Sequence, residues 1–294
     1  MISRLQVVNY PAFQHAEVAV KILRDDLLHP VISGNKFRKL KYQIPEAIYQ
    51  GKSNLVTFGG AFSNHVLAVA CAASQNGLSS YAFIRGDELS GENHVLLLCK
   101  YFGMKLHFVS REDYNKKREL FNSHFGADPD AYFIEEGGSN TLAVKGCREI
   151  VSTLNESFDN IICAAGTGGT AAGIAIESFK QSPATKVYAI SALKGGEFLK
   201  DEIERLAGCQ LPNLNLQTNF HCGGYAKTSN ELMRFIYHFL DCTGILLDPI
   251  YTGKMMWALK SLVEAKEIKK NSSVLCIHTG GIIGGLSLLA KSVK

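Results

Sequence analysis

The chain lacks the residue spacings that mark disulfide-linked and metal-binding proteins. Its eight cysteines form no C-x-x-C pair, and most of them lie within apolar runs, as buried free thiols do. Its nine histidines show neither H-x-x-H nor H-E-x-x-H spacing. We therefore expect no disulfide framework, no metal site, and a reduced protein of the cytoplasm.

Long apolar runs and an excess of one charge are missing too. Apolar runs such as VLAVACAA, residues 66–73, are far too short to span a bilayer, and the N-terminal residues lack the apolar core of a signal peptide. The 31 basic and 27 acidic residues give a net charge of +4, which leaves no basic footprint for nucleic acid. We expect no export, and neither a membrane nor a nucleic acid as partner.

What the chain does contain is a regular alternation of short apolar runs with longer helical patterns. Near-continuous apolar strands that alternate with helices predict parallel sheets covered by helices on both faces. A length of 294 residues suits two modest domains or one large α/β domain. The predicted strands are 54–58, 80–84, 105–109, 131–135, 160–165, 186–191 and 273–278. The predicted helices are 37–50, 64–77, 91–103, 113–125, 140–154, 170–180, 195–206, 228–241, 254–269 and 283–292.

Glycine-rich turns follow three of the predicted strands and lead into helices. They lie within residues 55–65, 161–173 and 274–285. In open α/β sheets, ligands collect at the carboxyl ends of the strands, where the free N–H groups and the dipole of a helix N-terminus favour anions. The pattern therefore predicts a ligand with more than one anionic group.

The clearest of these turns is GTGGT, residues 166–170, between a strand and a helix. With Ala171 it matches the G-x-G-x-x-A pattern of dinucleotide sites, but Ser-Ala at 191–192 stands where such a site needs an acidic residue for the ribose. A Walker loop is excluded because no Gly-Lys-Ser/Thr follows. Two readings stay open, a site for a single phosphate and a tight turn that needs glycine for packing alone.

Four cations fall within SGNKFRKLKY, residues 33–42. Lys36 follows a Ser-Gly-Asn turn at the start of a predicted helix, whose dipole disfavours a charged amine there. Arg38 and Lys39 add positive charge that lowers the pKa of this amine further, which suits a lysine used for Schiff-base chemistry. From the residues alone, the stretch is a solvated helix face, a grip for a polyanion, or the site of one reactive lysine.

Eight sequence blocks stand in order across nearly the whole chain. They are LRDDL (23–27), SGNKFRKLKY (33–42), TFGGAFSNH (57–65), EEGGSN (135–140), AAGTGGTAAG (164–173), GGYAKTS (223–229), LLDPIYTGK (246–254) and HTGG (278–281). Together they resemble pyridoxal-phosphate enzymes of the tryptophan-synthase-β type, called fold type II. Within that group they resemble the branch that contains 1-aminocyclopropane-1-carboxylate deaminase and D-cysteine desulfhydrase.

The resemblance implies an α/β fold of two domains, each an open twisted sheet covered by helices. It implies a larger domain of residues 1–49 and 156–294 that binds pyridoxal 5'-phosphate, and a smaller α/β domain of residues 50–155. A homodimer and a small amino acid as substrate are implied as well.

Within SGNKFRKLKY, the resemblance gives each cation its own role. Lys36 matches the lysine that holds the cofactor covalently, and Lys39 matches a second lysine close to the cofactor phosphate. Arg38 and Lys41 are left as the predicted solvated face of the helix.

Other positions match residues that hold the cofactor. Asn64 matches the asparagine that bonds the phenolic oxygen of pyridoxal phosphate. Thr252 and Thr279 stand in the blocks that supply the partner of the ring nitrogen. The phosphate cup is matched by Gly166, Thr167, Gly168, Gly169 and Thr170.

A second set of positions matches the substrate site. Tyr225 and Tyr251 match two tyrosines near the substrate, and Tyr251 or Ser63 is expected to assist proton transfer. Lys36 is expected to remove the α-proton of the amino acid. The turn that receives the substrate carboxylate, at a helix N-terminus suited to an anion, is matched by Ser63, Asn64 and His65.

The reaction is predicted from the groups that face the ring nitrogen. The deaminase pattern has a glutamate directly after the second tyrosine, where this chain has Thr252, and HLGG where this chain has HTGG with Thr279. A neutral hydroxyl makes the ring a weaker electron sink. This favours β-elimination of the D-cysteine desulfhydrase type, giving pyruvate, ammonia and sulfide. Other hypotheses are a 1-aminocyclopropane-1-carboxylate deaminase that releases 2-oxobutyrate and ammonia, sulfonate elimination, D-serine dehydration, and a non-catalytic protein that holds pyridoxal phosphate.

Overall fold

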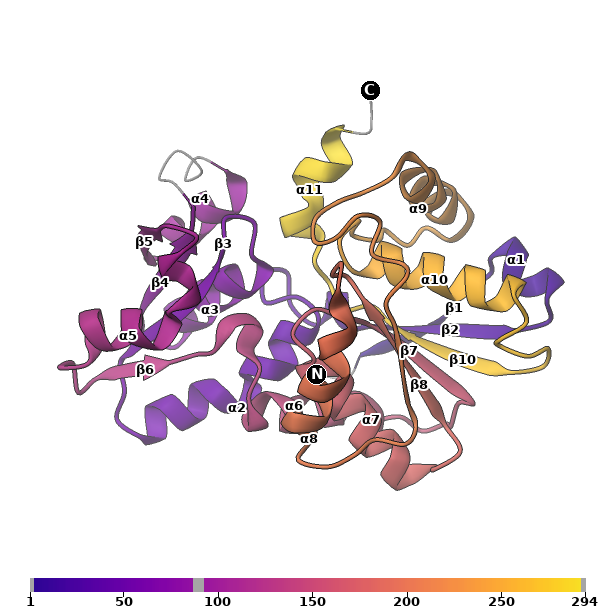
Figure 1. Cartoon of the computed structure of the whole chain (residues 1–294), viewed down its shortest axis with the longest axis horizontal. Coiled ribbons are helices and arrows are strands. Elements are labelled where there is room, and N and C mark those ends of the chain that lie inside the picture. The colour runs from indigo at the N-terminus through magenta and orange to yellow at the C-terminus, as the bar shows by residue number, and fades with distance from the viewer. Residues whose placement is uncertain (1–2, 87–92, 292–294) are drawn as a thin grey trace.

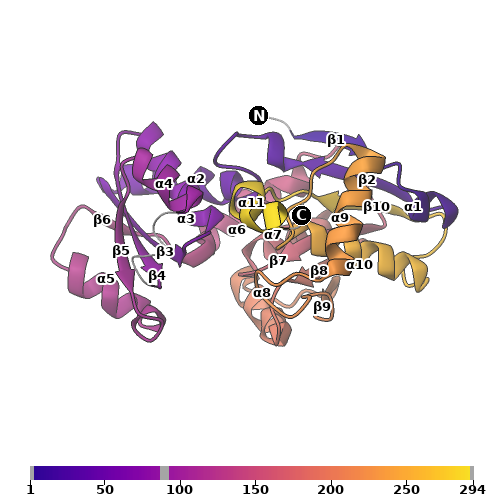
Figure 2. The same cartoon turned by 90° about the horizontal axis from the view of Figure 1, so that it is seen from above.

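Two mostly parallel sheets form the centres of two α/β units in the computed structural model, which describes residues 3–86 and 93–291 (Figure 1). One unit contains a six-stranded sheet and the other a four-stranded sheet. The view from above shows the two units side by side, with α2 and α6 near their junction (Figure 2). This is the mixed α/β architecture, with two helix-covered sheets, that the sequence predicts.

The six-stranded sheet has the order β1-β2-β10-β7-β8-β9, and its strands pair in parallel except that β1 runs antiparallel to β2. Neighbouring residues of one strand pack into the cores on opposite faces of the sheet, because side chains alternate between the two faces. Ile162 packs with α1, α9 and α10, whereas Ile161 packs with α6, α7 and α8. The strands are β1 (Arg4–Val7), β2 (Ala19–Arg24), β7 (Asn160–Ala165), β8 (Lys186–Ser191), β9 (Leu214–Gln217) and β10 (Ser273–Ile277). The helices are α1 (Pro11–His15), α6 (Thr141–Ser152), α7 (Gly169–Gln181), α8 (Leu199–Ala207), α9 (Asn230–Thr243) and α10 (Thr252–Glu264).

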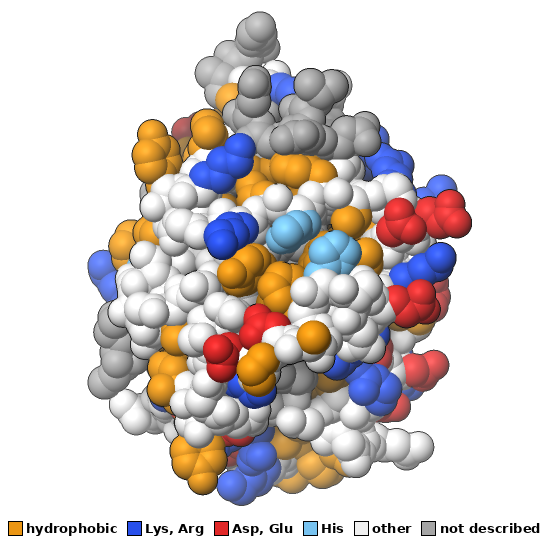
Figure 3. Space-filling view, turned by 90° about the vertical axis from the view of Figure 1, so that its left-hand side faces the viewer, with side chains coloured by type: hydrophobic (Ala, Val, Ile, Leu, Met, Phe, Trp, Pro, Cys, Tyr) orange, Lys and Arg blue, Asp and Glu red, His pale blue; other side chains and the backbone are white. Residues whose placement is uncertain are grey.

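The four-stranded sheet has the order β5-β4-β3-β6 and is parallel throughout. Leu55 faces a core shared with α2, α3 and α4, and Val56 faces an aromatic core with Phe58, Phe83 and Phe125. The strands are β3 (Asn54–Gly60), β4 (Ser79–Arg85), β5 (Lys105–Val109) and β6 (Ala131–Phe133). The helices are α2 (Asn35–Tyr49), α3 (Asn64–Gln75), α4 (His94–Tyr101) and α5 (Lys117–Phe125), and α11 (Ile282–Lys291) follows the last strand of the other sheet. Seen from the outside, this unit mixes side chains of both charges with hydrophobic ones (Figure 3).

The two helices next to the predicted domain limits, α2 and α6, each pack in the core of the unit on the other side of the limit. Leu40 and Ile44 of α2, before the limit at 49, lie in the core of the four-stranded unit. Cys147 and Ile150 of α6, before the limit at 155, lie in the core of the six-stranded unit. Amphipathic spacing shows that a helix is covered but does not show by which sheet. The division at 49 and 155 therefore stays a prediction.

The structure adds elements that the apolar pattern did not indicate. β1, β2, β9 and α1 were not predicted, and β1 departs from the expected parallel pairing. Their sequences RLQV, AVKILR and LNLQ place polar residues between apolar ones, which gives a short and weak strand signal. The predicted helix 254–269 ends at Glu264, and the predicted helix 91–103 begins outside the described residues.

The described residues contain no helix long and apolar enough to cross a membrane. In the same part of the chain, no group of three or more histidine, cysteine, aspartate or glutamate side chains is placed to hold a metal ion.

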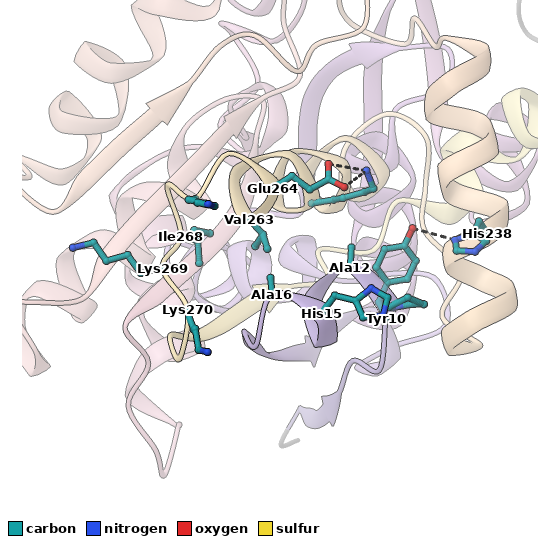
Figure 4. Close-up of a pocket in the computed structure, with 13 residues that line it drawn as sticks. Tyr10, Ala12, His15, Ala16, His238, Val263, Glu264, Ile268, Lys269 and Lys270 are labelled. Atoms are coloured by element: carbon teal, nitrogen blue, oxygen red, sulfur yellow. Dashed lines mark hydrogen bonds and ion pairs between the residues drawn. The ribbon is translucent and has the colours of Figure 1, made fainter.

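A hollow of about 740 Å³ lies on the six-stranded unit, lined by residues of α1, α9, α10 and the turn after α10 (Figure 4). Tyr10 and His238 meet there, with the tyrosine hydroxyl 3.1 Å from His238 Nδ1. The hollow contains none of the predicted site residues. The candidate site is a different cavity.

Candidate active site

A cavity of about 530 Å³ opens where the glycine-rich turns of the two sheets meet. It lies at the carboxyl ends of β3, β7 and β10, the position expected for a ligand of open α/β sheets. Two predicted residues, Gly169 and Thr252, do not line it. The predicted residues that do are Lys36, Lys39, Ser63, Asn64, His65, Gly166, Thr167, Gly168, Thr170, Tyr225, Tyr251 and Thr279.

Lys36 is held at the start of α2 by contact between backbones. Gly34 has φ of +66°, and a Cβ at this position would lie 1.8 Å from the Thr279 carbonyl oxygen. The Asn35 backbone N–H donates to that same oxygen at 3.3 Å. Only glycine fits such an approach, so the beginning of α2 is pinned to the turn after β10.

The amine of Lys36 is partly buried and has little around it to stabilise a charge. Its only hydrogen bond within the described residues is a long one, 3.5 Å from Nζ to the Gly137 carbonyl oxygen. Burial, and then the nearby charge of Lys39, hold the pKa of Lys36 well below its usual value. A lowered pKa increases the fraction of the neutral amine, which is the form that acts as a nucleophile and a base.

Lys39 lies one turn further along α2 and is well hydrogen-bonded. Its Nζ donates to the Gly137 carbonyl oxygen and to Ser139 Oγ, each at 2.9 Å, and to Thr167 Oγ1 at 3.4 Å. Ser139 Oγ and Thr167 Oγ1 are 2.6 Å apart. Burial lowers the pKa of Lys39 to about 8. Ser139 was not predicted as a site residue, although it stands in the EEGGSN block.

The turn at 166–170 forms an anion site together with Lys39. Gly168, with φ of +82°, caps α7, so the first N–H groups of a 13-residue helix point to the cavity end. The Asn35 amide donates to Thr170 Oγ1 at 2.8 Å and fixes that side chain. Gly169 lies behind the cavity wall, where a Cβ would come within 3.3 Å of Lys39 Nζ. Each of these features favours a compact anion such as a phosphate group.

Arg38 and Lys41, on the same helix, show that the predicted solvated face is only half correct. Arg38 is 5% exposed, and its Nε donates to Asp25 Oδ2 at 2.6 Å in a buried ion pair. Lys41 forms an exposed pair with Glu149. A charge run in a sequence does not reveal a partner 13 residues away, which is why the burial of Arg38 was missed.

Residues 63–65 form the wall of the cavity that belongs to the four-stranded unit. Ser63 Oγ accepts from the Val66 N–H at 3.3 Å and caps α3. The Asn64 amide spans the cavity edge, donating to the Gly281 carbonyl oxygen at 3.3 Å and accepting from the Gly284 N–H at 2.9 Å. The predicted substrate turn is therefore joined to the turn that leads into α11.

His65 lies in this turn as a buried, neutral side chain. Its Nε2 is 2.8 Å from Thr57 Oγ1, and that hydroxyl donates to the Ile134 carbonyl oxygen at 3.0 Å. Because the hydroxyl proton is used there, the ring donates through Nε2. Burial, and then the charges of Lys36 and Lys39, hold the pKa of His65 well below its usual value. His65 therefore brings no positive charge to a carboxylate.

Two tyrosines form the opposite wall. The ring centroids of Tyr225 and Tyr251 are 6.1 Å apart, in an edge-on arrangement. Burial raises the pKa of both hydroxyls, that of Tyr251 well above its usual value. Both side chains are therefore protonated at neutral pH and can donate a hydrogen bond or a proton.

Thr252 does not face the cavity, which corrects its predicted role beside the cofactor. Its side chain is 0% exposed, and its hydroxyl lies 2.7 Å from Asp248 Oδ2. The same carboxylate accepts from the backbone N–H groups of Tyr251 and Thr252, each at 2.8 Å, and so caps α10. Thr279 is the one of the two predicted threonines that lines the cavity.

The comparisons with known proteins agree with this geometry. The family model described as "Pyridoxal-phosphate dependent enzyme" matches residues 2–280. The chain belongs to this family. It is 32% identical over 292 residues to the bifunctional D-cysteine desulfhydrase/1-aminocyclopropane-1-carboxylate deaminase, mitochondrial, of Arabidopsis thaliana, covering 90% of this chain and 72% of that one.

Two further relatives belong to the same branch. A D-cysteine desulfhydrase of Yersinia enterocolitica is 29% identical over 284 residues, which cover 89% of this chain and 86% of the relative. The crystal structure of an ACC deaminase homologue superposes with a TM-score of 0.85 at 28% identity, covering all of this chain and 93% of the other. The fold is that of fold type II pyridoxal-phosphate enzymes.

Pyridoxal phosphate is the cofactor of this family, and the cavity fits it. The phosphate would be held by the 166–170 turn and Lys39, where the N–H groups of α7 and the hydroxyl of Thr167 converge. Lys36 presents to the cavity the amine that would hold the cofactor covalently. A Cβ at Gly166 would lie 3.1 Å from the Tyr251 ring, so this wall keeps space that a side chain would fill. When bound, the cofactor supplies an electron sink for the carbanion of an amino acid.

Proposed function

We propose that the enzyme breaks down a small amino acid by β-elimination of the D-cysteine desulfhydrase type. In the balanced reaction, cysteine and water give pyruvate, ammonia and hydrogen sulfide. The observation that carries this proposal is the placement of Lys36 in one cavity with the anion site at residues 166–170 and the helix N-terminus at Ser63. The names of the relatives from Arabidopsis and Yersinia support the same class of substrate.

Each residue of the cavity has a step that suits its chemistry. The Ser63 turn and the N-terminus of α3 receive the α-carboxylate of the substrate. Lys36 Nζ, whose lowered pKa increases the fraction of neutral amine, takes the α-proton. The hydroxyl of Tyr251, protonated because its pKa is raised, gives a proton to the leaving thiolate. Tyr225 covers the same wall and limits the access of water.

The neutral side chain of Thr279 favours elimination over opening of a cyclopropane ring. Among the residues that the structure describes, two carboxylates line the cavity, and each is bound elsewhere. Asp26 pairs with Arg24 at 2.7 Å, and Glu136 accepts from the Tyr114 hydroxyl at 2.8 Å. A strong electron sink needs a carboxylate facing the ring nitrogen, and neither of these is free to take that place.

A second candidate is 1-aminocyclopropane-1-carboxylate deaminase, which gives 2-oxobutyrate and ammonia. The bifunctional name of the Arabidopsis relative supports it. A third hypothesis, of another class, is a protein that holds pyridoxal phosphate without catalysis. The presence of Lys36, Tyr225 and Tyr251 in one cavity argues against this hypothesis. The cytoplasmic location and the homodimer stay predictions. Light scattering of the purified protein tests whether it is a homodimer.

The experiment offers D- and L-cysteine, D-serine and 1-aminocyclopropane-1-carboxylate to the purified holoenzyme and measures sulfide, pyruvate and 2-oxobutyrate. We expect sulfide and pyruvate in equal amounts from one enantiomer of cysteine. Release of 2-oxobutyrate at a higher kcat/KM would favour the deaminase. A yellow protein that exchanges no α-proton of any amino acid in deuterated water would establish the non-catalytic hypothesis.

A further inference from the structure

Lys254 is a buried lysine that the proposed mechanism does not use. It lies in the first turn of α10 and is 1% exposed. Among the described residues, Lys39 is the other lysine buried to this degree, and it lines the cavity, whereas Lys254 does not. Burying an amine costs free energy unless a hydrogen bond compensates it, so the partner of Lys254 indicates what the side chain does.

The partner of Lys254 is a backbone carbonyl group. Lys254 Nζ donates to the Gly224 carbonyl oxygen at 2.9 Å, and this is its only hydrogen bond within residues 3–86 and 93–291. The Gly224 carbonyl belongs to the peptide bond that joins Gly224 to Tyr225. The backbone on the N-terminal side of Tyr225 is therefore held from α10, the helix that begins directly after Tyr251.

The turn that carries Tyr225 needs support from its surroundings. Four of its residues have positive φ: Cys222 with +51°, Gly223 with +93°, Gly224 with +123° and Ala226 with +54°. Positive φ is unfavourable for cysteine and alanine, and it persists only where neighbouring groups fix the backbone. The Lys227 N–H donates to the Gly224 carbonyl oxygen at 3.2 Å. The carbonyl that Lys254 holds is thus also the one that closes the turn around Tyr225.

The same helix positions the second tyrosine of this wall. Tyr251 precedes α10, and its N–H donates to Asp248 Oδ1 at 2.8 Å. Tyr225 is 42% exposed, so packing restrains its ring only in part, and its centroid lies 6.1 Å from that of Tyr251. Because Lys254 stands on α10, its bond to the Gly224 carbonyl fixes the position of one tyrosine relative to the other.

We propose that Lys254 is a positioning residue that holds Tyr225 against Tyr251 by binding the carbonyl group before Tyr225. This inference rests on the proposed function, in which the two tyrosines form one wall beside the substrate. Lys254 does not line the cavity, so it acts on catalysis through the turn. Without its bond, the turn samples other conformations, and Tyr225 covers the wall for only part of the time.

Hydrogen exchange of the holoenzyme, followed by mass spectrometry, tests the hold on the turn without any substrate. K254M keeps the length of the side chain and removes its donor. The Gly224 carbonyl keeps its bond from the Lys227 N–H, so no buried acceptor loses its last partner and we expect the variant to fold. Peptides that cover residues 222–227 should exchange about tenfold faster, as for a lost charge-assisted hydrogen bond, while β7 exchanges as in the wild type.

Two further variants complete this measurement. K260M removes a lysine of the same helix that pairs with Glu264, and the turn should exchange in this control as in the wild type. K254R keeps a donor at the position and should recover part of the protection. Exchange of the turn in K254M that is no faster than in K260M would overturn the proposal.

A double-mutant cycle tests whether Lys254 acts through Tyr225. The holoenzyme is assayed with the amino acid that it turns over fastest, and kcat/KM is compared for the wild type, K254M, Y225A and the double variant. We expect K254M to lower kcat/KM about tenfold in the wild type and less than about twofold once Tyr225 is absent. An equal loss in both backgrounds would mean that Lys254 acts elsewhere, and the proposal would be wrong.

The two measurements separate this proposal from the proposed function. If the holoenzyme eliminates no β-substituent but the turn exchanges faster in K254M, the hold on Tyr225 stands and the proposed reaction fails. If elimination is observed and the turn exchanges in K254M as in the wild type, the proposed reaction stands and the role of Lys254 is refuted.

Discussion

The two walls of the cavity are built in opposite ways. On the wall around the 166–170 turn, polar groups bond to one another: Lys39 to Ser139 and Thr167, and Asn35 to Thr170. On the wall of the four-stranded unit, Arg85 lies free of any carboxylate among the described residues. Satisfied buried networks are rigid, whereas an exposed cation such as Arg85 is solvated by water and less constrained. The rigid wall therefore suits a group that stays in place, such as the phosphate of the cofactor.

The strongest way to break this comparison is to remove the reactive amine between the walls. K36A should lower kcat by about 10²–10⁴-fold or more, since it removes the predicted base, and should abolish the visible absorbance of covalently held cofactor. K41A, which removes an exposed lysine of the same helix, is the control and should keep both signals. Retained turnover of cysteine by K36A would contradict the assignment of Lys36.

The second prediction concerns the phosphate side of the rigid wall. K39M should lower the affinity for pyridoxal phosphate about ten- to a hundredfold, because a buried charge-assisted contact to the phosphate is lost. Equilibrium dialysis of the cofactor-free protein measures this affinity. A loss in catalytic rate with no loss in cofactor affinity would instead place Lys39 on the substrate side.

The pH dependence of cofactor binding follows from the same lysine. The pKa of Lys39 is lowered from 10.5 to about 8 by burial, so the cofactor-free protein loses this positive charge as the pH rises through 8. We expect affinity for the cofactor to fall above pH 8 in the wild type and much less in K39M. In the absence of cofactor, the unfolded chain binds the extra proton between pH 8 and 10.5, so the contribution of Lys39 to folding stability improves over that window.

Asn64 connects the two walls and provides a prediction of intermediate size. N64A removes two hydrogen bonds to the 281–284 turn and the predicted contact with the phenolic oxygen of the cofactor. We expect cofactor affinity to fall about tenfold, together with a shift of the cofactor absorbance maximum. A lower melting temperature with unchanged absorbance would mean that Asn64 only joins the two units.

The smallest expected effect tests the corrected role of Thr252. T252A should destabilise the protein by about 1–2 kcal/mol, because the buried Asp248 carboxylate loses a hydroxyl partner, and should lower the melting temperature by a few degrees. T252S restores the hydroxyl and should recover most of the stability. A change in the cofactor spectrum of T252A larger than its change in stability would reinstate the predicted contact with the ring.

Local patterns predicted the parts of the molecule that depend on near neighbours. Strands such as β7 and β8 are continuous apolar runs, and the glycine turns between strand and helix were visible from spacing. Lys36, Lys39 and Ser63 could be assigned because each stands in a distinctive block. The edge strands β1 and β9 were missed because half of their residues are polar.

Contacts between distant segments could not be predicted in this way. Arg38 meets Asp25, and Arg85 lies over the Tyr114 ring, only because the chain folds back on itself. Thr252 was placed at the cofactor because it follows Tyr251, yet the next residue of a helix points about 100° away from its neighbour. The helix rotation, which the block does not reveal, turned its hydroxyl toward Asp248.

The tight approach of Gly34 to Thr279 sets a limit on how this enzyme can be altered. Position 34 accepts no side chain, since a Cβ would overlap the Thr279 carbonyl, so the reactive end of α2 cannot be moved by mutation there. At Gly60, by contrast, the nearest atom to an added Cβ is Arg85 Nη2 at 4.0 Å. In a laboratory selection for new substrates, we therefore expect no substitutions at position 34. Position 60 has space for a side chain and could be substituted.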